Sequence, residues 1–94
     1  MDTFVSSNSP YRLCVKNVGR IDDSVLLEQV LSHLRSSERI CLDKKKIGPS
    51  EDYWDGRIDN HKFTLYFDID YLDIDFVADS ISTINLLSKF LKAK

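Results

Sequence analysis

The chain has 94 residues, of which 43% are hydrophobic and 30% charged, and its formal net charge is −2 at pH 7. This length fits a single domain over residues 1–94, and the composition excludes an intrinsically disordered chain. No apolar run reaches the roughly 18 residues that span a bilayer, and the N-terminus has neither the basic nor the apolar region of a signal peptide. We therefore expect a cytoplasmic protein without a membrane segment.

The first third of the chain predicts a flexible tail, a strand and a helix. Residues 1–9 are mostly polar and are predicted to form the tail. Residues 11–16 alternate apolar and polar side chains, which is the period of a half-buried strand. Asp22 or Asp23 then offers a carboxylate to the free amides of a helix start. The apolar residues that follow at helical spacing are Val25, Leu26, Leu27, Val30, Leu31 and Leu34.

The middle of the chain predicts a short strand over 39–42 and then a long loop. Residues 43–57 begin with the lysines 44–46, contain Gly48-Pro49 and Asp55-Gly56, and show no clear period. We expect a loop of about 15 residues, which is long for a compact domain. The lysines are interpreted as solvated, because a nucleic-acid site requires a broader basic face with stacking aromatics. Direct binding of nucleic acid is therefore not expected.

The last third predicts a hairpin and a helix. Residues 63–70 and 72–76 alternate apolar and polar side chains, which indicates two strands joined by a tight turn. Asp79 is predicted to cap the last helix, and Lys89, Lys92 and Lys94 near its end suit the helix dipole. The apolar face of this helix consists of Ile81, Ile84, Leu87, Phe90 and Leu91. The predicted order is β-α-β-β-β-α, an α+β fold of about four strands with two helices packed on one face.

The two cysteines lie inside apolar strand patterns. Cys14 and Cys41 are therefore predicted to be buried free thiols. A disulfide would require their strands to be neighbours, and nothing in the sequence indicates an oxidising compartment.

Acidic residues are concentrated between residues 51 and 79. This segment holds nine acidic and two basic residues, whereas the rest of the chain holds six acidic and eleven basic residues. Four of the acids, Asp68, Asp70, Asp73 and Asp75, are predicted to lie on the polar side of the hairpin. They form either a solvated face that discourages edge pairing or a negative surface that binds a basic partner.

Four further residues are candidates for the same surface. Asp55 and Asp59 would extend its negative charge, and Tyr53 and Trp54 are aromatic residues of the kind that anchors protein interfaces. An alternative role for Trp54 is to cover an open end of the core. Both roles remain open at this point.

The sequence contains no motif for catalysis or for metal and phosphate binding. Asp68-x-Asp70 with Asp79 at the twelfth position departs from a calcium-binding loop at Leu72 and Asp73. No Gly-rich phosphate loop and no Cys-x-x-Cys pair is present, so we expect neither a metal nor a cofactor. A small enzyme that uses His61 with Asp59, close to Trp54, remains an alternative.

The stretch from Tyr53 to Ile74, about a quarter of the chain, resembles small immunity proteins of bacterial toxin systems, those of contact-dependent growth inhibition above all. The resemblance implies tight inhibition of a toxin, often a nuclease, by a cytoplasmic protein made in the same cell. We therefore expect a protein that is not an enzyme and that binds a basic toxin surface. A phage or mobile-element protein that mimics nucleic acid is the alternative, because it would carry the same acidic face.

Overall fold

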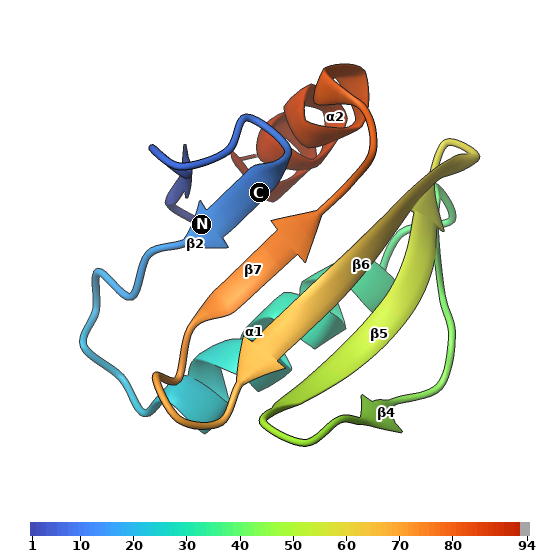
Figure 1. Cartoon of the computed structure of the whole chain (residues 1–94). Coiled ribbons are helices and arrows are strands. Elements are labelled where there is room, and N and C mark those ends of the chain that lie inside the picture. The colour runs from blue at the N-terminus through green and yellow to red at the C-terminus, as the bar shows by residue number, and fades with distance from the viewer. Residues whose placement is uncertain (93–94) are drawn as a thin grey trace.

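The computed structural model describes residues 1–92 and contains two helices and a seven-stranded sheet (Figure 1). In chain order the elements are β1 (Thr3–Val5), β2 (Arg12–Val15), α1 (Asp23–Arg35), β3 (Ile40–Leu42), β4 (Lys46–Ile47), β5 (Glu51–Ile58), β6 (His61–Asp68), β7 (Ile74–Val77) and α2 (Ile81–Lys92).

All strand pairs are antiparallel, and the order across the sheet is β1-β2-β7-β6-β5-β3, with β4 also paired to β5. Both helices lie on the same side of the sheet (Figure 1). We call the opposite side, which neither helix covers, the open face. The α+β class is therefore confirmed, whereas the predicted number of strands and the predicted order of elements along the chain are wrong.

The core lies between the helices and the inner face of the sheet. Alternate residues of the central strands point into it: Leu13, Trp54, Ile58, Phe63, Leu65, Phe67, Ile74 and Phe76. The first helix begins as predicted, since the Asp22 carboxylate accepts a hydrogen bond from the Ser24 N–H. Its buried stripe is narrower than predicted because Val25 is exposed.

The segment predicted as a loop over 43–57 contains the longest pairing of the sheet, in which β5 pairs with β6 over eight residues. Its apolar period is hidden because the inward position between Trp54 and Ile58 is Gly56. A Cβ atom at Gly56 would lie 2.8 Å from the backbone oxygen of Cys41 and 2.9 Å from the Phe63 ring. The glycine is therefore required by the close approach of β3, and it removes the sequence signal for a strand.

The predicted flexible tail over 1–9 instead contributes β1. Phe4 pairs with Cys14 of β2, and the N-terminal ammonium of Met1 donates to the carbonyl of Leu91 at 3.0 Å. Isolated strand propensity is weak over three residues, so this strand depends on the edge that β2 offers. The chain start is thus placed between the sheet and α2.

The second helix begins two residues after its predicted cap. Ser80, not Asp79, directly precedes it, and the Ser80 carbonyl accepts the N–H of Ile84 at 3.3 Å. Lys89 and Lys92 lie in its last turn as predicted, and Lys94 lies outside the described residues. No helix within residues 1–92 has the length and apolar character required to cross a membrane.

The two cysteines are free thiols on strands that are not neighbours. Cys14 is half-buried, whereas Cys41 is exposed on β3, so burial is confirmed only in part. Burial raises the pKa of the Cys14 thiol to about 12, and a hydrogen bond to Asp75 adds to the shift.

Candidate functional site

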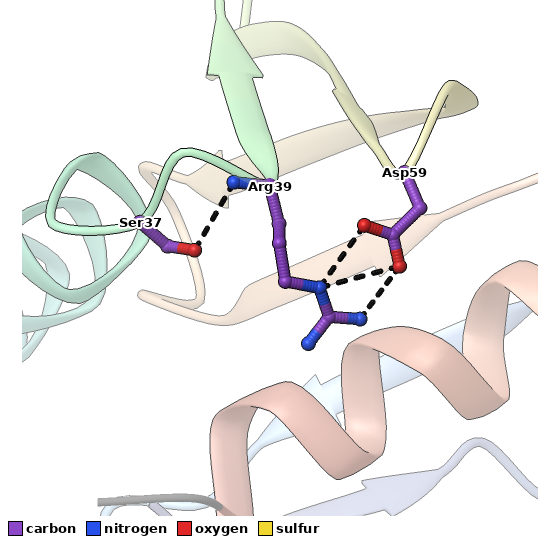
Figure 2. A network of polar contacts seen from close by, with 3 residues as sticks. All are labelled: Ser37, Arg39 and Asp59. Carbon is purple, nitrogen blue, oxygen red and sulfur yellow. Dashed lines mark hydrogen bonds and ion pairs between the residues drawn. The ribbon is translucent and has the colours of Figure 1, made fainter.

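The turn between β5 and β6 is closed by an ion pair (Figure 2). Arg39 donates from Nε to Asp59 Oδ1 at 3.0 Å and from Nη2 to Oδ2 at 2.7 Å, and its backbone N–H donates to Ser37 Oγ. The hydrogen bonds from Arg39 lower the pKa of the Asp59 carboxyl. Because this acid is already neutralised within the chain, it offers little to a partner.

Two more predicted binding acids are paired on the open face. Asp55 accepts from Lys46 Nζ at 2.8 Å and from the Thr64 hydroxyl at 2.9 Å, and these bonds lower its pKa. Asp75 accepts from Arg12 at 2.8 Å. The continuous acidic face expected from the sequence is therefore interrupted by the chain's own cations.

The two predicted aromatic anchors lie on opposite sides of β5. Trp54 is 3% exposed and belongs to the core, so its alternative role in covering the core is the one that fits. Tyr53 points to the open face, where its ring lies 5.8 Å from that of Tyr66 and 5.8 Å from Lys46 Nζ. Only Tyr53 is accessible to a partner.

The remaining predicted acids gather at the other end of β6, around the turn over residues 69–73, which we call the β6–β7 turn. Asp68 Oδ1 accepts the backbone N–H groups of Asp70 and Tyr71, at 2.9 and 3.0 Å. The N–H of Ile69 donates to the Ser50 carbonyl at 2.9 Å, which ties the turn to the segment between β4 and β5. Its position is thus fixed by backbone contacts on both sides.

Three large apolar side chains of the β6–β7 turn face solvent. Tyr71 is 79% exposed, Ile69 47% and Leu72 45%. Leu72 also has a φ of 58°, in the left-handed region, where a residue with a Cβ is destabilised by about 1–2 kcal/mol. Exposed apolar side chains and backbone strain both lower the stability of the isolated chain, and such features concentrate at binding sites.

The acids around this turn, Asp68, Asp70 and Asp73, are outside the ion pairs found within residues 1–92. Partial burial of the carboxyl and the negative charges of Asp75 and Asp68 raise the pKa of Asp73. The turn therefore combines apolar contact area with unpaired negative charge. This combination is complementary to a surface of another molecule that is partly apolar and carries positive charge.

The sequence does not identify Ile69, Tyr71 and Leu72, because its alternation assigns Ile69 and Leu72 to the buried sides of two predicted strands. A tight turn between those strands would have required positive φ at its central residues, a conformation that favours Gly and Asn. The missing Gly or Asn was the available signal. It indicates a wider turn in which Ile69 and Leu72 leave the core.

The arrangement needed for the alternative enzyme is not formed by the residues proposed for it. His61 is exposed and does not line the depressions on either side of its turn, Asp59 is engaged by Arg39, and Trp54 is in the core. Within residues 1–92, no three His, Cys, Asp or Glu side chains are grouped to hold a metal ion.

Comparison of the chain with known protein families, curated proteins and solved structures gives no match in any of the three.

Proposed function

We propose that this chain is an inhibitory binding protein of the toxin-immunity type, which uses the β6–β7 turn to occupy a basic surface of a partner protein. Tyr71 and Leu72 provide the apolar contact, and Asp70 and Asp73 provide the charge. A nuclease toxin is the partner class that best suits such a surface, because its active site is basic in order to bind phosphate.

The observation that carries the proposal is the coincidence of three costs in one short turn. Apolar side chains exposed to water, Leu72 in a left-handed conformation and unneutralised acids all occur within residues 69–73. Elsewhere on the sheet the acids Asp55 and Asp75 are paired. The exposure of the apolar groups and the unpaired negative charge are both relieved when a partner covers those groups and supplies cations.

The test uses the full chain and a charge-reversed turn variant, Asp70→Lys with Asp73→Lys. Each is co-expressed in a bacterial host with the product of the gene adjacent to its own, where that product arrests growth. We expect the wild-type chain to restore growth and to bind the purified toxin, and the turn variant to bind at least about a hundredfold more weakly, as for lost close charge pairs.

A matched control carries the same change in net charge away from the turn, as Glu28→Lys with Glu38→Lys. Glu28 lies on the exposed side of α1, and Glu38 is exposed in the segment between α1 and β3. It should protect the host as the wild type does. Equal protection by all three proteins would place the interface elsewhere. A second variant, Tyr71→Ala, tests the apolar contribution to affinity. It should weaken binding of the toxin without changing how the association rate depends on salt concentration.

A further inference from the structure

The open face of the sheet has an ordered distribution of charge that extends well beyond the β6–β7 turn. Cross-strand register places Glu51 opposite Asp68, and the Asp68 N–H donates to the Asp73 carbonyl, so these three residues form an acidic row at one end of the face. At the other end Arg57 lies opposite Lys62, and we call these two the basic pair.

The two rows between these ends contain two of the chain's own ion pairs. One row contains Cys14, Asp75, Tyr66, Tyr53 and Lys46, and the other contains Arg12, Val77, Thr64 and Asp55, with Asp43 beside Asp55. Two diagonal ion pairs, Arg12–Asp75 and Lys46–Asp55, connect them at 2.8 Å each. The centre of the face therefore carries paired charges and two tyrosine rings, whereas the cross-strand pairs at its two ends, Glu51–Asp68 and Arg57–Lys62, have opposite charges.

Both charged ends destabilise the isolated sheet. Like charges directly opposite each other on neighbouring strands repel, and neither Glu51, Asp68, Arg57 nor Lys62 belongs to an ion pair within residues 1–92. From Lys62 to Asp68 the ends are about 20 Å apart at about 3.3 Å per residue, which is too far for them to neutralise each other through water and salt.

The two ends are placed symmetrically about one cross-strand pair. Asp68 and Lys62 are each three residues from Leu65 on β6, and Glu51 and Arg57 are each three residues from its partner Trp54 on β5. A twofold axis that lies parallel to the face and crosses the strands at this pair brings Asp68 of one copy over Lys62 of a second copy. The same axis brings Glu51 over Arg57.

We infer that the chain associates with a second copy of itself, face to face, through the open face of the sheet. The contact is isologous, so each complementary pair occurs twice. Tyr53 and Tyr66 lie together on one side of the axis, and the same two residues of the second copy lie on the other side, so the four rings supply the aromatic centre that is typical of interfaces. On β7 the axis carries Asp73 toward Asp79, which is also an acid, so the complementary contacts belong to β5 and β6 alone.

The test measures the mass of the purified full chain by sedimentation equilibrium and needs no partner, so its outcome is independent of the proposed inhibitory function. We expect a dimer whose dissociation constant rises with salt concentration. Arg57→Glu makes both ends of β5 acidic, and Glu51→Lys makes both ends basic. Each variant alone should dissociate at least about tenfold more readily, because each like-charge contact occurs twice.

The decisive sample is an equimolar mixture of these two variants. One copy then presents acids at both positions 51 and 57 and the other presents bases at both, and the mixed dimer should regain the wild-type affinity or exceed it. The control mixture, Arg35→Glu with Glu38→Lys, changes exposed charges away from the open face and should leave every affinity unchanged. A monomeric wild type, or a mixture that dissociates as readily as its components, would overturn the inference.

Discussion

The strand β6 is bounded by two turns that reverse the chain by different means. At its start, Asp59 and Asn60 have φ values of 47° and 70°, as in a type I′ turn, and Arg39 neutralises the acid. At its end, five residues complete the turn, Leu72 takes a φ of 58°, and the acids are in none of the ion pairs within residues 1–92. The first turn uses residues suited to its backbone, and the second does not.

This difference separates a structural turn from a candidate binding turn. Asp and Asn tolerate the left-handed region because their short polar side chains bond locally, whereas the branched apolar side chain of Leu forms no such hydrogen bonds. A sequence under selection for stability alone would carry Gly or Asn at position 72 and polar residues at positions 69 and 71. Retention of costly residues in one turn and not in the other is the physical basis for assigning the interface.

The largest change in stability is expected at Leu65, in the middle of the strand that connects the two turns. Leu65 is fully buried midway along β6, and Leu65→Ala should reduce the free energy of unfolding by about 2–5 kcal/mol. Urea unfolding followed by circular dichroism measures the loss. Amide exchange should increase in both turns together, and increased exchange in only one of them would show that the turns are not supported by a common strand.

A smaller effect is expected from the structural turn. Asn60→Ala places a residue with a stronger preference for negative φ at 70° and should destabilise the protein by about 1 kcal/mol. Asn60→Gly is the matched control and should be close to neutral. Urea unfolding that shows the same loss for both variants would contradict the backbone explanation.

The corresponding change at the other turn should have the opposite sign. Leu72→Gly relieves the left-handed strain and removes an exposed apolar group, so it should stabilise the isolated chain by about 0.5–1 kcal/mol after the entropy of the unfolded glycine is counted. The same variant should weaken partner binding. A variant that loses stability would show that Leu72 makes intramolecular contacts that outweigh its strain.

The sequence was sufficient for the elements whose apolar period is uninterrupted. The stripe from Leu26 to Leu34 predicted α1, and the alternation around Leu65 predicted β6. It failed for β5, because Gly56 occupies an inward position for the sake of the neighbouring backbone, and for β1, which forms only against β2. Both failures have a tertiary cause that a single-sequence period does not contain.

The candidate site was predictable in its charge but not in its composition. Asp70 and Asp73 were identified from the local excess of acids, whereas the pairing of Asp55 and Asp59 depends on Lys46 and Arg39, which are distant in sequence. Which acids remain uncompensated is decided by strand register. Register is a property of the assembled sheet, so the sequence could indicate an acidic region but not which of its acids remain unpaired.

The smallest effect concerns the two acids that best represent the two turns, Asp73 and Asp59, and it distinguishes them by sign. The raised pKa of Asp73 means that its charged form is disfavoured in the folded state, so its cost is present at neutral pH and disappears as the pH falls through the folded pKa. Asp73→Asn should therefore stabilise the chain by about 0.5 kcal/mol near pH 7, the scale of a like-charge cross-strand pair, and by nothing at about pH 3.

Asp59 has a lowered pKa, so its favourable contribution is present at neutral pH and is lost as the pH falls through that lowered value. Asp59→Asn should consequently destabilise the chain near pH 7, and less so in acid. Urea unfolding of both variants across this range measures the two slopes, and slopes of the same sign would remove the electrostatic distinction between the turns.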